Sequence, residues 1–387
     1  MRLTTALSLL LGVPGTLVAA TTYFRETFDD DAWKTRWLQS SSRADYGKFA
    51  ISTGTFFADP VASRAFQTQD DARNYAISAP FTKEFDSTNS TFVLQYSVKF
   101  ERGSNCAGGY IKILPPGVDV ARLNGETPYN IMFGPDICGP DQKVHFILNY
   151  DKENRMIQGE IPAPIDQLSH LYTLIIYPNQ TYAILIDNEV DAEGSLFDDF
   201  DFFPPKTIPD PNASKPADWD DRETIDDETD EMPDDWEDEP EEIPDPEDPP
   251  PKYWNEDVDG EWFRTMVPNP LWKGEWTPRQ IPNPKYKGAW VHPEIANPKY
   301  FYHQNVHAYK SAYVAFELWQ VTAGSLFDDI LVTDSVEEAH AMAAAFVARR
   351  VPEYKAKEKL DNEDRARVRR EKEAKEKEKA AKGHSEL

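Results

Sequence analysis

Phe92-Val-Leu-Gln-Tyr-Ser-Val-Lys-Phe100 is the stretch that decides the fold class. Its large apolar side chains stand at every second position: Phe92, Leu94, Tyr96, Val98 and Phe100. Successive residues of a β-strand point to opposite faces, so this spacing predicts a strand with one apolar face turned toward a core.

Comparable short segments recur along the chain and are separated by turn residues, which is typical of an all-β sandwich. With 40% hydrophobic and 12% aromatic residues, the composition is sufficient for a large core. We expect the sandwich to run from about residue 22 to 204 and to be completed only after a long insertion. The further predicted strands are 110–114, 129–133, 144–150, 171–177, 182–187, 313–321 and 330–333.

The insertion consists of two kinds of repeat. The first, 208–219, returns at 225–236 and 243–254, with tryptophans 17 and 18 residues apart. The second begins at Gly260, Gly274 and Gly288, and each copy leads into an Asn-Pro pair. So much proline and charge cannot bury a globular core. Three copies of one unit followed by three of another instead predict an extended hairpin arm, with a disordered acidic linker as the alternative.

The negative charge of the chain is concentrated in this insertion. The formal net charge is −27, and residues 208–259 alone contain 23 acidic and 3 basic side chains. Such a segment repels nucleic acid and attracts cations or basic partners.

The two ends of the chain resemble address signals. Residues 1–20 contain Arg2, an apolar run over 6–11 and small residues at 18–20, which predicts a secretory signal peptide. A membrane anchor is the alternative, but a spanning helix needs roughly 20 apolar residues. The last four residues, His-Ser-Glu-Leu at 384–387, resemble a KDEL-type retrieval signal. Together these signals predict the lumen of the endoplasmic reticulum, and sequons at Asn89, Asn179 and Asn212 are compatible with it.

After the sandwich, a helix and a charged tail are expected over 335–387. Ser335-Val-Glu-Glu338 reads as a capping box that opens a helix through residue 350. From 353 to 382 alternating charges predict a solvated helix. Residues 351–387 contain 12 basic and 10 acidic side chains.

The only two cysteines are Cys106 and Cys138. An oxidising compartment would allow them to form a disulfide, and two buried free thiols are the alternative. A zinc site is less favoured, because no further cysteine or nearby histidine offers the spacing of metal ligands.

Two stretches around these cysteines, Cys106-Ala-Gly-Gly-Tyr-Ile-Lys-Ile113 and Tyr129-Asn-Ile-Met-Phe-Gly-Pro-Asp-Ile-Cys-Gly139, resemble the signature of the calreticulin and calnexin family. With both repeats present, the resemblance covers about residues 23–333. Calnexins carry a spanning helix and usually four copies of each repeat, so the chain is more similar to the calreticulin branch. The resemblance implies a legume-lectin-like jelly-roll β-sandwich over 21–206 and 301–334, interrupted by a Pro-rich hairpin arm over 207–300 and followed by a C-terminal α-helix.

The resemblance also implies a function. Members are calcium-dependent lectin chaperones that bind monoglucosylated N-glycans on unfolded glycoproteins and catalyse no reaction, and we expect a monomer. The positions that correspond to the family's carbohydrate site are Tyr110, Lys112, Tyr129, Met132, Asp136, Glu317 and Trp319.

These residue types suit a sugar, because aromatic rings cover the apolar faces of pyranoses while Lys and carboxylate groups bind hydroxyls. Strand periodicity places Tyr110 with Lys112, and Glu317 with Trp319, on one face of their strands. Tyr129 and Trp319 could instead be core aromatics. The family has Asp where this chain has Glu317, and the extra methylene moves a carboxylate by roughly 1.5 Å. A Cys106–Cys138 disulfide would tie the Tyr110 strand to the loop that carries Asp136.

The segment Gly324-Ser-Leu-Phe-Asp-Asp329 resembles the family's structural calcium site. The resemblance implies a carboxylate from Asp328 and backbone carbonyls from Thr27, Ala62 and Arg64, which suits the oxygen coordination of Ca²⁺. A surface aspartate in a turn is the alternative.

The resemblance further implies a partner at the tip of the arm, a disulfide-exchanging oxidoreductase with a basic face. Asp259, Glu261 and Trp262 match the contact positions. A solvated acidic turn is the competing interpretation.

Two other functions are alternatives to a lectin. Glu189-Val-Asp-Ala-Glu193 fits an E-x-D-x-E pattern of some β-sandwich glycoside hydrolases, and period-two spacing would put Glu189, Asp191 and Glu193 on one strand face. A retaining pair needs carboxyl groups about 5 to 5.5 Å apart. A protein that mainly stores calcium is the third hypothesis, and the basic tail argues against it.

Overall fold

The alternating stretch forms strand β6 (Phe92–Phe100) in the first of two eight-stranded sheets. The computed structural model describes residues 20–103, 106–236 and 239–383. The predicted retrieval signal, and all of the predicted signal peptide except Ala20, lie outside these residues. The chain divides into two units, one containing 1–204 and 301–387 and the other 205–300.

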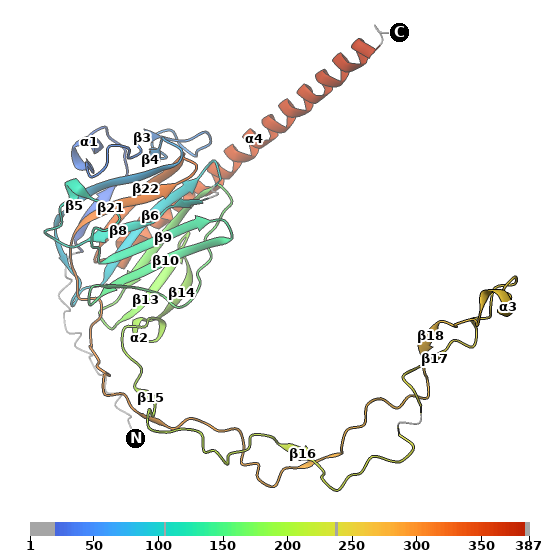
Figure 1. Ribbon diagram of the computed structural model, residues 1–387. Helices are drawn as coiled ribbons and strands as arrows, with labels where there is room; N and C mark the ends of the chain where they lie inside the picture. Colours follow the sequence, from blue (N-terminus) through green and yellow to red (C-terminus); the bar gives the residue numbers. More distant parts are fainter. Residues whose placement is uncertain (1–19, 104–105, 237–238, 384–387) are drawn as a thin grey trace, which may run out of the picture. The chain divides into compact units, whose positions relative to one another are not determined.

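The first sheet is antiparallel and has the order β14-β13-β12-β6-β22-β4-β3, with β1 paired to β22 beside β4 (Figure 1). Strand β22, the last strand of this sheet in chain order, therefore lies in the middle of the sheet. The bounds are β1 Thr22–Glu26, β3 Phe49–Ser52, β4 Ala65–Thr68, β12 Ser169–Ile176, β13 Thr181–Ile186, β14 Glu189–Ser195 and β22 Ser325–Thr333.

The second sheet has the order β11-β10-β9-β7-β21-β5-β2, and β8 pairs with both β21 and β9. Strand β21, the last strand of this sheet in chain order, likewise lies inside the sheet. The bounds are β2 Leu38–Gln39, β5 Arg73–Asp86, β7 Cys106–Gly108, β8 Ile111–Leu114, β9 Ile131–Cys138, β10 Asp141–Tyr150, β11 Glu153–Met156 and β21 Lys310–Gln320.

The predicted all-β sandwich is confirmed, and each predicted strand is present. Two strands differ most from their expected limits: β9 continues through Gly134 and Pro135 to Cys138, and β22 begins at Ser325. The core between the sheets is rich in aromatic rings, such as Phe66 stacked on Phe49 with centroids 4.3 Å apart. In the described part of the sandwich unit, three short helical segments lie outside the sheets: α1 (Trp33–Arg36), a 3₁₀ turn (Val120–Arg122) and α2 (Leu196–Asp199).

Strand β6 is buried on both faces, because helix α4 (Val336–Gly383) covers the face opposite the core. The polar residues of the strand point toward this helix. Gln95 donates to the carbonyl of Ala339 at 3.2 Å, and the Lys99 ammonium lies 3.2 Å from the Glu353 carboxylate. Lys99 also lies 3.0 Å from Glu101, which balances its charge in a buried setting.

Helix α4 differs from its prediction in two ways. The hydroxyl oxygen of Ser335 accepts a bond from the Glu338 backbone N–H, but the Glu338 carboxylate accepts from Thr22 and Thr333 instead of completing the capping box. The helix also continues through Pro352, where a boundary was expected. Next to this proline, Glu353 is held by Lys99 and by the Ser169 hydroxyl at 2.8 Å, which stabilises the helix across the missing backbone bond.

The unit 205–300 is a hairpin whose outgoing and returning segments pair in reverse order, as the repeats predicted (Figure 1). Within each of the three modules, the indole N–H of a first-repeat tryptophan donates to the carbonyl of a second-repeat glycine: Trp219 to Gly288, Trp236 to Gly274 and Trp254 to Gly260. The short elements are β15 Thr207–Pro209, β16 Thr224–Asp226, β17 Glu242–Pro244, α3 Glu256–Asp259, β18 Met266–Pro268, β19 Gln280–Pro282 and β20 Glu294–Ala296.

His307 makes the stability of the sandwich sensitive to acid. The side chain is fully buried, its Nδ1 lies 3.2 Å from Gln180 Oε1, and burial lowers its pKa from 6.5 to about 4. The unfolded chain therefore binds the proton first, and stability is lost as pH falls below 6.5. Between pH 7 and 5 we expect this histidine to contribute a loss of about 2 kcal/mol in the free energy of unfolding.

Urea unfolding at the two pH values, compared between the native chain and His307→Gln, measures this contribution. The variant should show a correspondingly smaller loss, whereas the exposed control His340→Gln should behave as the native chain. An equal loss in His307→Gln and the native chain would contradict the assignment.

Candidate functional site

The residues predicted to bind carbohydrate gather on the outer face of the second sheet. Lys112 on β8 lies directly opposite Met132 on β9 and Ala315 on β21. Side chains that oppose each other across a ladder share a face, and alternate residues of a strand stay on it. Glu317 and Trp319 therefore follow Ala315 on this face, and Asp136 follows Met132.

A salt bridge between Lys112 and Glu317 lies at the centre of this face. The Lys112 ammonium is 2.8 Å from Glu317 Oε2, and both side chains are largely buried. The same ammonium lies 4.9 Å from the centroid of the Tyr129 ring. The longer side chain of Glu317 thus reaches Lys112 in good geometry, and its Oε1 stays available to accept a hydroxyl hydrogen.

The Tyr110 ring packs closely against Gly108. A Cβ atom at Gly108 would come within 2.9 Å of the ring, so the close approach requires glycine. Burial, together with the nearby Glu317 and Asp136 carboxylates, raises the pKa of Tyr110 above its usual value of 10. The hydroxyl therefore keeps its proton and can act as a donor at neutral pH.

Trp319 and Tyr129, the two aromatic residues that could have been core residues, differ in their exposure to solvent. Trp319 is 42% exposed, so the core interpretation is wrong for its side chain. Tyr129 is 9% exposed and packs in a small apolar cluster with Leu114, Met132 and Ile147. Trp319 can present a ring to a ligand, while Tyr129 mainly supports Lys112.

His145 on β10 belongs to the same surface, although the sequence analysis did not identify it. Its ring stacks on Tyr110 with centroids 6.0 Å apart, and its Nε2 lies 3.7 Å from Asp136 Oδ2. Burial lowers the pKa of His145 and raises that of Asp136. The available signal was its alternation with Lys143 and Ile147 on the strand next to Asp136.

The two cysteines form a disulfide, so the free-thiol alternative is wrong. Cys106 and Cys138 lie opposite each other in the β7–β9 ladder, two steps from the Gly108 and Asp136 pair. The bond thus joins the strand before Tyr110 to the strand that carries Asp136.

Asp328 is a buried residue, which rules out a surface aspartate in a turn. It lies beside a bulge in β22, where Asp329 adopts a positive φ of 54°. Its Oδ1 has no hydrogen-bond partner among the residues that the structure describes, and burial beside Asp329 raises its pKa. A buried carboxylate in this state is suited to a cation.

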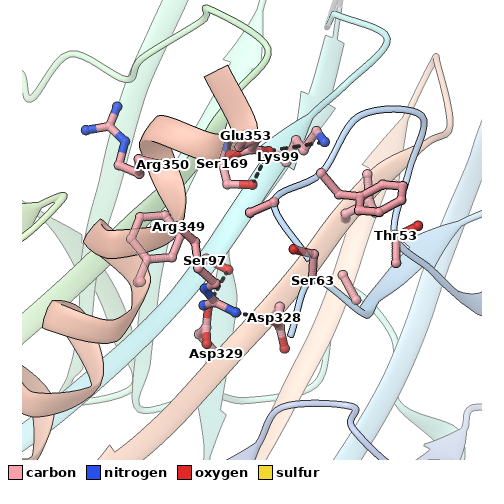
Figure 2. Close-up of a pocket in the computed structure, with 15 residues that line it drawn as sticks. Thr53, Ser63, Ser97, Lys99, Ser169, Asp328, Asp329, Arg349, Arg350 and Glu353 are labelled. Atoms are coloured by element: carbon pink, nitrogen blue, oxygen red, sulfur yellow. Dashed lines mark hydrogen bonds and ion pairs between the residues drawn. The ribbon is translucent and has the colours of Figure 1, made fainter. Parts of the chain in front are cut away.

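The three residues expected to give carbonyl donors do not line the cavity of Asp328. Thr27 and Ala62 line a cavity together with Asp329. Asp328 lines a neighbouring cavity of about 40 Å³, together with Asp329 and Ser63 (Figure 2). The Arg64 side chain turns to Asp31 at 2.6 Å, and its carbonyl is not placed at either cavity.

Side chains alone do not form a metal site here. Within residues 20–103, 106–236 and 239–383, no group of three or more His, Cys, Asp or Glu side chains is arranged to hold a metal ion. A metal ion at Asp328 would therefore need carbonyl oxygens in addition to this carboxylate, which is a donor type that Ca²⁺ accepts.

The tip of the arm differs from its other two modules. Lys273 and Lys287 lie over the rings of Trp236 and Trp219, at 5.6 and 5.7 Å from the centroids. At the tip, Asp259 takes the place of the lysine before glycine, and Trp254 instead packs edge to face with Trp262 at 5.0 Å. Asp259 and Glu261 are exposed, so the tip presents acidic side chains beside two indole rings.

The three acidic residues of Glu189–Ser195 do not share a strand face, contrary to the period-two prediction. The β13–β14 register shifts between Ile184 and Leu185, which leaves Asp191 as an extra residue. Glu189 opposes Ile186, which packs on the core between the sheets, whereas Glu193 opposes Ala183, which packs beneath α4. The bulge thus turns Glu189 and Glu193 to opposite faces.

Comparison with known proteins agrees with this geometry. The sequence model of the Calreticulin family matches residues 24–259 and 259–332. Calreticulin from Caenorhabditis briggsae is 48% identical over 347 residues, covering 89% of this chain and 87% of the relative, and that from Bos taurus is 47% identical over 364 residues, covering 92% and 86%. The chain belongs to the calreticulin family.

A solved structure supports this membership of the calreticulin family at the level of the fold. The globular domain of T. cruzi calreticulin superimposes with a TM-score of 0.64 and 27% identity, covering 88% of this chain and 99% of that one. No helix in the described part of this calreticulin-family chain is both long and apolar enough to cross a membrane.

The pair formed by His145 and Asp136 can be tested by NMR. Because burial lowers the pKa of His145 and the Asp136 carboxylate opposes this effect, the imidazole should titrate below 6.5 and should be neutral at pH 7. Asp136→Asn removes the opposing charge and should lower the pKa of His145 further. An imidazole ¹⁵N titration checks both values, and a midpoint at or above 6.5 in the native chain would contradict the arrangement.

Proposed function

We propose that the chain is a calcium-binding lectin chaperone of the endoplasmic reticulum lumen that binds monoglucosylated N-glycans on unfolded glycoproteins. Membership of the calreticulin family gives it a chaperone and lectin role in general terms. The observation that carries the finer proposal is the convergence of Tyr110, Lys112 and Glu317 on one sheet face, from segments up to about two hundred residues apart.

The chemistry of this face suits a glucose residue. Trp319 offers an exposed apolar ring, while Lys112 and the Tyr110 hydroxyl can donate to ligand oxygens. Glu317 and Asp136 can accept from hydroxyl groups, and neutral His145 leaves the Asp136 carboxylate free to do so. Donors, acceptors and an apolar ring thus share one face, as the ring and hydroxyls of a pyranose require.

Calcium is the proposed resident metal. Asp328, with carbonyls of Thr27, Ala62 and Arg64, would hold it, and the unpartnered Asp328 Oδ1 fits such a donor set. When bound, the ion would supply positive charge that stabilises two adjacent buried carboxylates. Since β22 carries Asp328 and follows directly on β21 with Glu317, calcium would stabilise the strand pair on which the carbohydrate face depends.

The proposed partner at the tip of the arm is a disulfide-exchanging oxidoreductase with a basic face. Support comes from the replacement of lysine by Asp259 and from the exposed Glu261 beside Trp262. Charge complementarity of this kind mainly accelerates association and selects the partner.

Neither alternative function is favoured. Members of the calreticulin family are non-enzymatic chaperones, and the Glu189 to Glu193 carboxylates lie on opposite strand faces. A predominant calcium-storage role would need a dense acidic tail, whereas residues 351–387 are slightly basic.

The Tyr110 hydroxyl tests the carbohydrate face. Tyr110→Phe removes one buried hydroxyl and should weaken binding of a monoglucosylated tetrasaccharide by about tenfold or more, because its partner on the ligand is left unpaired. Calorimetric titration with glucosylated and unglucosylated ligand, with and without chelator, measures the effect. Tyr253→Phe on the arm, where the side chain is 88% exposed, is the matched control. Wild-type affinity in Tyr110→Phe would refute the assigned face.

The tip can be tested by giving it the lysine of the other modules. Asp259→Lys should weaken binding to a basic disulfide oxidoreductase by about tenfold, because it places a positive charge opposite a positive surface. Asp234→Lys, at another exposed position of the arm, makes the same change in net charge. Surface plasmon resonance at low and high salt compares the two. Equal affinities for both variants would place the contact elsewhere.

A further inference from the structure

Arg349 on helix α4 lies at the predicted calcium site. Its Nη1 donates to the carbonyl oxygen of Ala62, one of the expected calcium ligands. Its Nη2 donates to Asp329 Oδ2 at 2.5 Å, and Nη1 lies 4.0 Å from Asp328 Oδ2. Figure 2 shows the guanidinium beside both aspartates, with Arg350 pointing away from them. One of the carbonyls that would hold a metal therefore accepts a bond from a side chain, whose charge also lies near Asp328.

We propose that Arg349 is a built-in cation that competes with Ca²⁺ for this site, so that calcium binding must displace the guanidinium from the Ala62 carbonyl. The proposal rests on the calcium site of the proposed function. It concerns how tightly the ion binds and what the ion does to helix α4.

Competition follows from the chemistry of the two cations. Calcium needs six to eight oxygen donors at 2.3–2.6 Å, so a site with one carboxylate depends on every carbonyl. A guanidinium has only donors and cannot coordinate a metal. While Arg349 is bonded to Ala62, its positive charge also lies 4.0 Å from Asp328 Oδ2, the proposed carboxylate ligand, and would repel an ion bound there.

The arrangement also explains why two adjacent buried carboxylates are tolerated. Asp329 is paired with Arg349, and the Ser97 hydroxyl lies 3.3 Å from it. Asp328 keeps one oxygen for which the described part of the chain offers no partner. Arg349 neutralises one of the two charges, and the remaining carboxylate oxygen is the one an incoming ion would meet first. The site is thus partly compensated without calcium and requires an exchange of cations to be filled.

Helix α4 should respond to this exchange. Two further polar anchors of the helix border the same cavity as Asp328 but bond other groups: Arg350 lies 3.0 Å from Asp187, and Glu353 bonds Lys99 and Ser169. Loss of the Arg349 contacts would therefore loosen the turn around residues 346–350 without detaching the helix. By thermodynamic linkage, whatever strengthens Arg349 docking weakens calcium binding to the same degree.

The test is a calcium titration of the full chain by calorimetry, comparing the native chain with Arg349→Gln and Arg350→Gln. The two variants remove the same charge from adjacent positions. Arg349 contacts Ala62 and Asp329, whereas Arg350 contacts Asp187. Arg349→Gln should bind calcium at its tightest site about tenfold more strongly, a coupling of ordinary size. Arg350→Gln should match the native chain.

Hydrogen exchange supplies a second readout that does not depend on affinity. In the native chain, calcium should accelerate amide exchange over 346–350, and in Arg349→Gln this response should be absent. Equal calcium affinity in all three proteins, or slower exchange over 346–350 with calcium, would overturn the competition. If neither the native chain nor Arg349→Gln bound calcium at a tight site, the assignment of the calcium site itself would be wrong.

Discussion

The structure depends on the insertion of two late strands into the middle of both sheets. Strand β21 lies between β5 and the β7–β8 segment, and β22 lies between β6 and the β4 and β1 strands. They follow the arm in the chain, so their partners on β5 and β6 are more than two hundred residues away in sequence. Neither sheet is continuous until these strands are in place. Such long-range pairing is slow to form, because chain entropy is lost before the contacts compensate it.

The same two strands carry residues of both proposed binding sites. Glu317 and Trp319 lie on the outer face of β21, and Asp328 lies at the bulge of β22. The proposed carbohydrate face, the proposed calcium site and the closure of the sandwich therefore all depend on the placement of these two strands. This arrangement explains why an acidic arm of about a hundred residues can interrupt the domain: its two ends only have to keep β21 within reach of its place.

Much of the fold was predictable from the sequence, because its signals are local. The alternation in Phe92–Phe100 indicated a strand, and the order of the repeats indicated a hairpin arm with reversed pairing. The face formed by Tyr110, Lys112 and Glu317 was predicted from family resemblance together with strand periodicity. The salt bridge between Lys112 and Glu317 could not be predicted from the sequence of either strand alone.

The remaining features depend on tertiary context. The bulge at Asp191 breaks the alternation without any glycine or proline to mark it, so the period-two prediction for Glu189 and Glu193 was wrong. Helix α4 passes through Pro352 because Glu353 is anchored to the sheet. Alternation along β10 indicates the sheet face of His145 but not its stacking on Tyr110. Arg349 reaches its site only through the packing of α4 on β22, which no local pattern reports.

The central claim is that one outer sheet face binds the glucosylated glycan. Hydrogen exchange of the full chain, with and without a saturating monoglucosylated tetrasaccharide at millimolar calcium, tests it most directly. Amides of β8, β9 and β21 should exchange more slowly with the ligand, while those of β13 and β14 in the other sheet should not change. Protection confined to β13 and β14, or no protection anywhere in the sandwich, would contradict the account.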